Sequence, residues 1–385
     1  MTTRRNLLGA LAGAALLPGA ALAAVAGLEA QLSAAASAES LGAIARRKGA
    51  RFGTAVGTSA RQFGDPAYRA LVARECNVMV AENEMKWQAL QPTRDAYRFG
   101  RADRMLAWAQ ESGMQMRGHN LFWQAEKWLP GWVTSESFGA QPARAVEQLM
   151  RTHVRTVCEH FGKAIDSWDV VNEAVDPADG KLRDNALTRP IGAIEQVDLA
   201  FRLAREYAPH AQLVYNDYMR GDAGSARHRA GVIALLAELR RRGTPVHALG
   251  LQSHIGSWDD TDRGRADLAD WRRFLDEVSA MGFDLLITEL DVNDRRLPAD
   301  VAKRDAGVAS AARDYLDVTL SYPRLRDVLL WGMADHISWL QEWKEAPRTD
   351  GLAMRPCPYD SQLRAKPLRE AIAAALRAMP PRAAS

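Results

Sequence analysis

The chain has 385 residues, 47% of them hydrophobic and 25% charged, and a formal net charge of +3 at pH 7. That composition is typical of a globular protein, and the length allows one large domain or two small ones. The basic residues are scattered and form no run interleaved with aromatic residues, which argues against a nucleic-acid partner.

The N-terminal segment differs in composition from the rest. A pair of arginines precedes an apolar stretch that is rich in Gly and Ala and too short for a comfortable membrane span, and small residues around Ala21 and Ala23 suit peptidase cleavage. We therefore predict an export signal over 1–23, of the twin-arginine type or an ordinary secretory one. An Ala-rich leader over 24–45 follows. The processed protein is expected in the periplasm or outside the cell, without stable membrane association.

Three cysteines occur, Cys76, Cys158 and Cys357. An odd number without short spacings excludes a disulfide framework and a zinc ribbon, so small buried apolar residues are the better interpretation. The sequence does not decide whether two of them pair.

After residue 50, short apolar or β-branched runs alternate with stretches of helical periodicity. The helical stretches, such as 143–160, 194–207, 226–242 and 266–280, carry apolar residues at three- and four-residue spacing. Eight strand-like runs lie at 52–60, 77–87, 114–123, 165–174, 212–219, 247–255, 284–292 and 327–339.

Eight strands that each return through a helix cannot pair as hairpins, so the sheet is predicted to be parallel. Eight right-handed crossovers close most naturally into a (β/α)8 barrel, and the lack of a Gly-rich loop after the first strand weighs against a doubly wound sheet. We predict an α/β fold with a single catalytic domain, a TIM barrel, over 46–380.

Polar and aromatic residues gather where the predicted strands end. In such barrels function sits at the carboxyl ends of the strands, so these residues outline a candidate site. They are Glu82, Asn83, Lys86, His119, Asn120, Trp123, Asn172, Glu173, Asn216, Asp217, Tyr218, Gln252, His254, Glu289, Asp291, Trp331, Asp335 and Trp339.

This set of residues favours one chemistry over others. There is no HExxH motif for a metal and no GxSxG elbow for a serine nucleophile, and Cys158 falls within a predicted helix. Two strand-end glutamates with Trp side chains fit glycoside hydrolysis, in which one carboxylic acid protonates the leaving oxygen and one carboxylate attacks the anomeric carbon. We expect no metal and no cofactor.

At this point a family resemblance is evident. The stretches WDVVNEA and ITELDV, with AENEMKW, GHNLFW, NDY, LQSH and WGMADHISW, resemble the motifs of glycoside hydrolase family 10 and occur in that family's order. The resemblance covers about residues 50–375. It implies a retaining endo-β-1,4-xylanase that acts on xylan or xylo-oligosaccharides, and we expect a monomer.

The resemblance assigns Glu173 as general acid/base and Glu289 as nucleophile. The amide of Asn172 would bind the 2-hydroxyl of the transferred sugar, and His254 with Asp291 would keep Glu289 ionised. Because Glu173 must be protonated while Glu289 is ionised, we expect the negative charge of Glu289 to raise the pKa of Glu173.

The resemblance also implies substrate contacts. Trp331 would form a platform under the sugar, Trp339 a lid, and Tyr218 a contact on the leaving-group side. Family members often carry His after the Trp of the third motif, where this chain has Gln124. The residues that would read sugar hydroxyls are Glu82, Asn83, Lys86, His119, Trp123 and Gln252.

Strand geometry adds a constraint at the fourth strand. Adjacent residues of a regular strand face opposite ways, yet Asn172 and Glu173 must both reach the sugar, so we predict a bulge or the end of the strand there. Core or rim positions are predicted for four other indoles, and structural roles for two helical histidines: Trp128, Trp132, Trp168, Trp271, His153 and His160.

Two other functions remain compatible with the sequence. The enzyme could act on β-1,4-glucan, because xylose and glucose units differ by one hydroxymethyl group and such discrimination is worth only about 1–3 kcal/mol. A non-catalytic sugar-binding barrel is the second, although a binder would have no need of both carboxylates.

Overall fold

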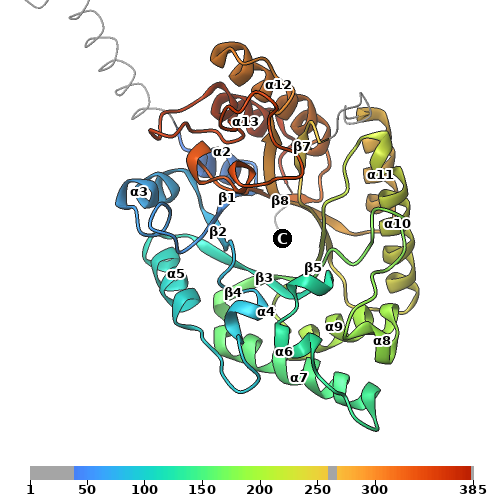
Figure 1. Ribbon diagram of the computed structural model, residues 1–385. Coiled ribbons are helices and arrows are strands. Elements are labelled where there is room, and N and C mark those ends of the chain that lie inside the picture. Colours follow the sequence, from blue (N-terminus) through green and yellow to red (C-terminus); the bar gives the residue numbers. More distant parts are fainter. Residues whose placement is uncertain (1–38, 259–266, 383–385) are drawn as a thin grey trace, which may run out of the picture. The chain divides into compact units, whose positions relative to one another are not determined.

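The predicted barrel is confirmed by a computed structural model, which describes residues 39–258 and 267–382. Every strand pairing in it is parallel, and the pairing of β6 with β8 closes the ring. Figure 1 views the barrel along its axis, with the strands around the centre and the helices outside. The strands are β1 Arg51–Val56, β2 Val78–Ala81, β3 Gln115–Trp123, β4 Ile165–Asn172, β5 Gln212–Asp217, β6 Ala248–Leu251, β7 His254–Gly256, β8 Asp284–Asn293 and β9 Leu325–Leu330.

The helices follow the strands as the periodicity predicts. The four stretches assigned to helices from the sequence correspond to α7, α9, α10 and α11, with small differences at their ends. The helices are α2 Leu41–Arg47, α3 Pro66–Glu75, α4 Trp87–Leu90, α5 Gly100–Glu111, α6 Gly131–Thr134, α7 Pro142–Phe161, α8 Thr188–Ile191, α9 Ala193–Tyr207, α10 Ala226–Arg241, α11 Leu268–Ala280, α12 Val301–Thr319 and α13 Pro367–Ala378.

Helix α7 shows how local sequence sets an element. Pro142 occupies the first turn, where its missing N–H costs nothing, and Gly162 ends the helix with a φ of 53°. Its buried residues recur at three- and four-residue spacing, which packs one face of the helix on the barrel. They are Val146, Met150, His153, Val154, Val157, Cys158 and Phe161.

The strands alternate between two cores. On β1, Phe52 and Val56 belong to the large core shared with the helices, whereas Ala55 joins a small cluster with residues of β2 and β9. Such alternation is what a pleated strand imposes, with even and odd residues on opposite faces. One face of the sheet therefore packs under the helices and the other fills the barrel.

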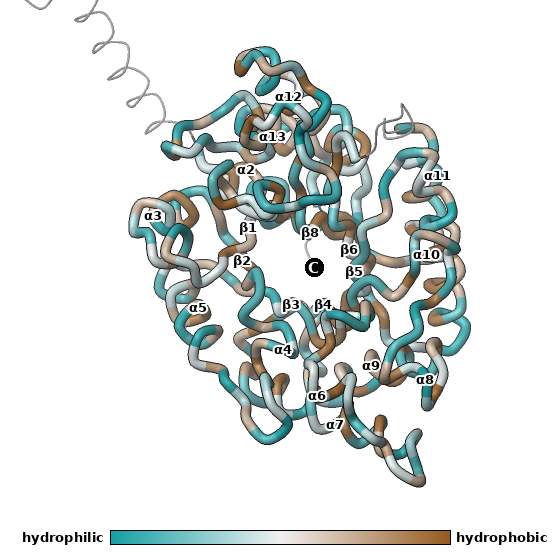
Figure 2. The backbone as a smooth tube through the Cα atoms, in the orientation of Figure 1, coloured by the Kyte–Doolittle hydropathy of each residue, from teal (hydrophilic) through white to brown (hydrophobic). Residues whose placement is uncertain are grey.

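The barrel interior also holds a buried ionic layer. Arg117 lies 2.6 Å from Asp169 and 3.8 Å from Asp327, and Asp327 lies 2.6 Å from Arg51. Arg117, Asp169 and Asp327 are almost fully buried, so each charge depends on its partners. Figure 2 shows hydrophilic stretches of chain beside β2, β3 and β5, around the centre of the ring.

Two predicted boundaries need correction. The sixth strand, predicted as one run over 247–255, is interrupted between β6 and β7, where Ser253 has a φ of 62°. Helix α2 packs Leu41, Ile44 and Ala45 into the core, and the compact unit begins at Ser40. The predicted leader therefore extends too far into the fold, because this short apolar helix was taken for loosely ordered chain.

Other predictions fall outside or at the edge of what the structure describes. The export signal over 1–23 and nearly all of the leader lie outside the described residues.

Cys76, Cys158 and Cys357 are buried free thiols, so the interpretation as small buried residues is confirmed. Within residues 39–258 and 267–382, no helix has the length and apolar character needed to cross a membrane.

Close packing of β3 on β4 yields a prediction for stability. A Cβ built on Gly118 would lie 2.1 Å from the indole of Trp168, which is buried and cannot move aside. We expect Gly118→Ala to lower the free energy of unfolding by about 1–3 kcal/mol, through overpacking. Denaturant unfolding measures this change. Gly131→Ala is the matched control, because no atom lies within 4 Å of its new Cβ; equal loss in both variants would contradict the argument.

Candidate active site

A cavity of about 630 Å³ opens at the carboxyl ends of the strands. Every residue to which the sequence assigned a catalytic or substrate-binding role lines it except Asp291, which lies behind His254. Of the other strand-end residues, Asn120, Asn216, Asp217 and Asp335 are buried and do not line the cavity. The sequence predicted a core or rim position for Trp128 and no role for the other lining residues, which lie outside the motifs. They are Ala125, Lys127, Arg183, Arg220, Trp258, Trp343, Glu345 and Ala346.

Glu173 stands immediately after the end of β4. Its φ of 58° is in the left-handed region, which turns its side chain to the same cavity as that of Asn172. The β4–β5 register also shifts between Asp169 and Val171. The predicted conflict between adjacent residues is thus resolved by the strand's end, with a register shift just before it.

Three side chains hold the carboxylate of Glu173. Trp123 Nε1 donates to Oε2 at 2.8 Å, and Gln252 Nε2 and Asn172 Nδ2 donate to Oε1 at 3.0 and 3.1 Å. Burial raises the pKa of Glu173 and is the largest effect, while the bonds from Gln252 and Trp123 oppose it and the charges of Asp217 and Glu289 add to it.

This order of causes corrects the expectation from the sequence. The charge of Glu289 does raise the pKa of Glu173, but burial contributes more, and so does Asp217. The low exposure of a side chain at a barrel mouth depends on loops that the sequence pattern does not reveal. Burial and Asp217 therefore continue to raise the pKa of Glu173 when Glu289 changes its charge.

Glu289 lies on β8, where its surroundings shift its pKa in the direction opposite to that of Glu173. Burial acts against its ionisation, but His254, the positive charge of His119 and the amide of Asn216 outweigh burial and lower the pKa of Glu289. Asn216 Nδ2 donates to Oε1 at 2.7 Å, and His254 Nε2 lies 3.3 Å from Oε2.

His254 is kept charged by its second partner. Its Nδ1 lies 3.0 Å from Asp291 Oδ1. Burial lowers the pKa of His254, but the charge of Asp291 and the hydrogen bonds to Asp291 and Glu289 raise the pKa to about 10. At neutral pH this residue is an imidazolium that donates to both carboxylates, which is the support predicted for Glu289.

An amide network joins the two glutamates. Asn216 Nδ2 donates both to Glu289 and, at 2.9 Å, to Asn172 Oδ1, while Asn172 Nδ2 donates to Glu173. Thr288 Oγ1 donates to Asn216 Oδ1 at 2.7 Å and so orients this amide. Asn216 was noticed at a strand end but given no role, because its link to both carboxylates appears only in three dimensions.

A second group of side chains lines the wall next to these carboxylates. Lys86 Nζ donates to Asn83 at 2.9 Å and stands 4.6 Å from the ring centre of Trp123 and 5.9 Å from that of Trp331. Burial lowers the pKa of Lys86, against the attraction of the nearby glutamates. Burial also raises the pKa of Glu82.

An aromatic cluster covers the His254 side of the cavity. Trp339 Nε1 donates to Asp291 Oδ2 at 2.7 Å, so Asp291 serves both the histidine and the predicted lid residue. Trp258 stacks on Trp339 with ring centres 5.9 Å apart, and Trp343 meets the same ring edge-on at 4.9 Å.

The departure at Gln124 has a structural explanation. Gln124 is buried, donates to Gln196 at 2.8 Å and accepts from Asn185 at 2.8 Å, so it links the loop after β4 to α9 and does not line the cavity.

The four other indoles lie at the core or rim positions predicted for them. Trp168 and Trp271 are core residues, Trp132 is packed at the edge of the core, and Trp128 lies at the rim with 36% exposure.

The two helical histidines also lie away from the cavity. His153 is buried, hydrogen-bonded to the carbonyl of Leu121 at 3.1 Å and stacked on Trp87, and burial lowers its pKa to about 3. His160 contacts Asp103 at 2.7 Å. Both contacts are consistent with the structural roles expected.

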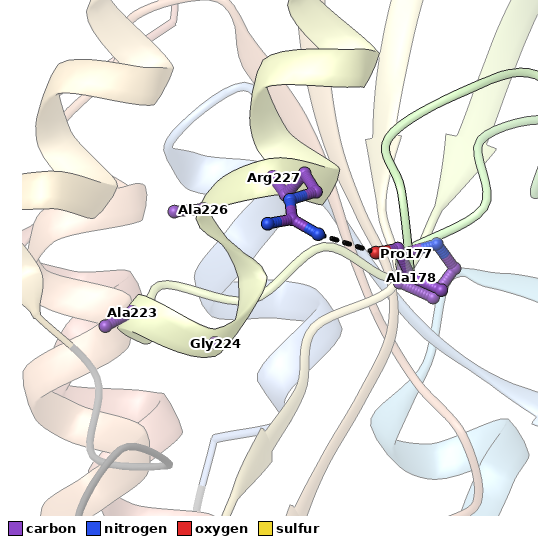
Figure 3. A pocket seen from close by; sticks show the side chains of 6 residues that line it. All are labelled: Pro177, Ala178, Ala223, Gly224, Ala226 and Arg227. Carbon is purple, nitrogen blue, oxygen red and sulfur yellow. Dashed lines mark hydrogen bonds between the residues drawn. The ribbon is translucent and has the colours of Figure 1, made fainter.

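A smaller pocket of about 380 Å³ lies apart from the carboxylates, between the loop after β4 and the start of α10. Figure 3 shows Arg227 reaching across it to the carbonyl of Ala178, at 3.0 Å. Arg227 is the only ionisable residue among the described residues that line it. The contact holds the loop that carries Glu173, and the pocket offers no groups for the same chemistry.

The geometry defines a (β/α)8 enzyme with two carboxyl groups in one cavity, one with a raised and one with a lowered pKa, which is the arrangement that acid/base hydrolysis of glycosides uses. Among the described residues, no group of three or more His, Cys, Asp or Glu side chains could hold a metal ion. The family model for "Glycosyl hydrolase family 10" matches residues 40–375. The chain therefore belongs to glycosyl hydrolase family 10, and it is a glycoside hydrolase.

Individual relatives agree with the family. The chain is similar to Endo-1,4-beta-xylanase A of Caldicellulosiruptor saccharolyticus, with 30% identity over 74% of this chain and 82% of that one. It is 31% identical to Exoglucanase XynX of Acetivibrio thermocellus over 85% of this chain, but spans only 29% of that protein. The structure of xylanase 10B from Thermotoga petrophila RKU-1 in complex with xylobiose is similar with a TM-score of 0.77, 28% identity and coverage of 88% and 97%.

The hydrogen bonds of Glu173 predict opposite pKa changes in two variants. Trp123→Phe keeps an aromatic ring but removes the N–H donor, so the pKa of Glu173 should rise further. Glu289→Gln removes a nearby negative charge, so the pKa of Glu173 should fall but stay above its ordinary value of about 4.3, because burial remains. Carbon NMR titration of a labelled Glu173 side chain measures both. If Glu173 titrates at its ordinary pKa in the Glu289→Gln variant, burial is not the main cause of its raised pKa.

Proposed function

We propose that the protein is a retaining endo-β-1,4-xylanase that cleaves internal bonds of xylan by double displacement. The observation that carries the proposal is a pair of carboxyl groups with opposite pKa shifts, the partly buried Glu173 upward and the buried Glu289 downward. A general acid must hold its proton and a nucleophile must be ionised at the same pH, and the opposite directions of the two pKa shifts support this division of roles.

In the first step, Glu289 attacks the anomeric carbon while Glu173 protonates the departing glycosidic oxygen. A glycosyl ester on Glu289 and a shortened chain result. In the second step, Glu173 removes a proton from water, which attacks the same carbon and releases Glu289. Esterification removes the charge of Glu289, so the pKa of Glu173 falls in the intermediate. Because burial dominates that pKa, we expect this fall to be partial.

The substrate is inferred from the cavity and the relatives. Its indoles supply faces for stacking on sugar rings, and its amides and ionisable groups supply partners for hydroxyls. Relatives named as xylanases and similar structures holding xylobiose, xylotriose or xylotetraose support a xylan chain.

A second candidate activity is hydrolysis of β-1,4-glucan by the same residues, which is favoured by the similarity to a protein named an exoglucanase. A non-catalytic sugar-binding barrel would have no use for the opposed carboxyl groups. Rates on xylan and on cellulose measured side by side decide between the two substrates. Faster release of sugar from cellulose would overturn the xylanase assignment.

Rescue chemistry separates the two glutamates. Glu289→Ala should abolish measurable turnover on every substrate. Glu173→Ala should slow xylan cleavage by about 10²–10⁴-fold, the usual contribution of a general acid, yet still form the covalent intermediate from aryl xylosides whose leaving group needs no proton. Stopped-flow release of the aryl group measures the difference. Equal losses on activated and unactivated substrates would contradict the acid role, and inversion at the anomeric carbon, seen by proton NMR, would contradict double displacement.

A further inference from the structure

The chain is strained between two residues of the site, Gln252 and His254. Ser253, which separates β6 from β7, has a φ of 62°. A residue other than glycine adopts this left-handed region only where its surroundings hold it there. Ser253 is buried and does not line the cavity. A costly backbone conformation thus lies between two cavity residues, and the proposed mechanism gives it no role.

The turn at Ser253 separates the partners of the two glutamates. Gln252 still follows β5, because its backbone N–H donates to the carbonyl of the last residue of that strand at 3.0 Å. His254 opens β7, which pairs with β8 and, among the described residues, with no other strand. Gln252 therefore reaches Glu173, at 3.0 Å, whereas His254 reaches Glu289, at 3.3 Å.

The side chain of Ser253 is held from the helix layer. Its Oγ donates to the carbonyl of Leu251 at 3.0 Å and lies 2.7 Å from the hydroxyl of Tyr315, on α12. Because a serine hydroxyl has one proton and Leu251 receives it, Tyr315 is the donor in the second bond. Burial raises the pKa of Tyr315, so its hydroxyl keeps that proton at neutral pH.

Tyr315 is itself fixed in place. Helix α12 contacts both β7 and β8 from outside the barrel (Figure 1). Tyr315 is buried, and its ring lies against the indole of Trp271 with ring centres 5.6 Å apart. Trp271 Nε1 donates to Thr319 Oγ1, which donates to the carbonyl of Tyr315, each at 2.9 Å. The donor to Ser253 therefore comes from a side chain with little freedom to move.

We propose that Tyr315 is a positioning residue for the reaction and that it acts through Ser253. By holding the strained turn, it keeps Gln252 in contact with the acid and His254 in contact with the nucleophile. Tyr315 does not line the cavity, so it acts without touching substrate. The inference rests on the proposed function, because that function assigns the two glutamates their roles.

Loosening the turn should shift the pKa values of both glutamates in the same direction. The bond from Gln252 lowers the pKa of Glu173, and the bond and charge of His254 lower that of Glu289. Both pKa values therefore rise when these contacts weaken. The other titratable neighbours stand on or after other strands, so the turn does not carry them. They are Glu82, Lys86, His119, Asp217, Tyr218 and Asp291.

Tyr315→Phe removes the hydroxyl and keeps the ring. The bell-shaped pH profile of kcat/KM on a xylo-oligosaccharide should then move as a whole to higher pH, by about half a unit. Its acidic limb follows the ionisation of Glu289 and its alkaline limb that of Glu173. Tyr322→Phe is the matched control, because Tyr322 is also buried and its hydroxyl donates to Asp276 on α11 at 2.6 Å. The control should lose a similar free energy of unfolding in denaturant and keep the wild-type profile.

Variants of Ser253 separate backbone strain from the lost hydrogen bond. Ser253→Ala loses the hydroxyl and keeps the unfavourable left-handed backbone, so its profile should move as in Tyr315→Phe. Ser253→Gly also loses the hydroxyl but adopts the same φ without strain. Its profile should stay closer to that of the wild type, and adding Tyr315→Phe should move it no further.

Carbon NMR titration of labelled glutamate side chains gives a readout that needs no turnover. Both Glu173 and Glu289 should titrate at higher pH in Tyr315→Phe than in the wild-type protein. Titrations and a pH profile that stay unchanged in Tyr315→Phe, with stability lost as in Tyr322→Phe, would overturn this inference. If the wild-type protein does not cleave xylan, the proposed function is wrong instead, and the two titrations still decide whether Tyr315 positions the partners of the glutamates.

Discussion

The side-chain amide of Asn216 is the contact on which both carboxyl groups depend. Its two N–H bonds go to Glu289 and to Asn172, whose own amide holds Glu173, and Thr288 fixes which end of the amide donates. The neighbouring strand must leave room for it: a Cβ on Gly250 would lie 2.4 Å from Asn216 Oδ1. A glycine on β6, with no chemistry of its own, thereby sets the relation between the two glutamates.

Burial raises the pKa of both Glu173 and Glu289, so the opposite directions of their net pKa shifts come from their hydrogen-bond partners and neighbouring charges. Glu173 receives neutral donors from an indole and amides, which do not overcome the cost of burying a charge. Glu289 receives a charged donor, because Asp291 keeps His254 protonated. Since Asp291 also accepts from Trp339, the pKa of Glu289 and the position of the Trp339 indole depend on one carboxylate.

The sequence predicted those features that a regular pattern encodes. Alternating runs of apolar residues identified the eight barrel strands, and polar residues after each run located the cavity. Features set by the local backbone or by loops could not be predicted from the sequence. The break at Ser253 and the packing of α2 follow no periodicity. Arg183 and Trp258 line the cavity but lie outside any motif. The leading role of burial in the pKa of Glu173 was missed for the same reason, because exposure is a property of the assembled loops.

The backbone at Glu173 shows how the fold maintains an unfavourable conformation at its functional site. A residue other than glycine in the left-handed region costs on the order of 1–3 kcal/mol and persists only where its surroundings over-determine it. Here Glu173 N donates to Asn216 O at 2.9 Å, Arg183 donates to the Glu173 carbonyl, and the N–H of Ala174 donates to the Tyr215 hydroxyl at 3.2 Å. The backbone N–H and carbonyl of Glu173 and the N–H of Ala174 are thus satisfied by β5 or by Arg183. With an ordinary extended backbone, Glu173 would point away from Asn172 and its carboxyl group would leave the cavity, so the strained φ is what places both side chains in one cavity.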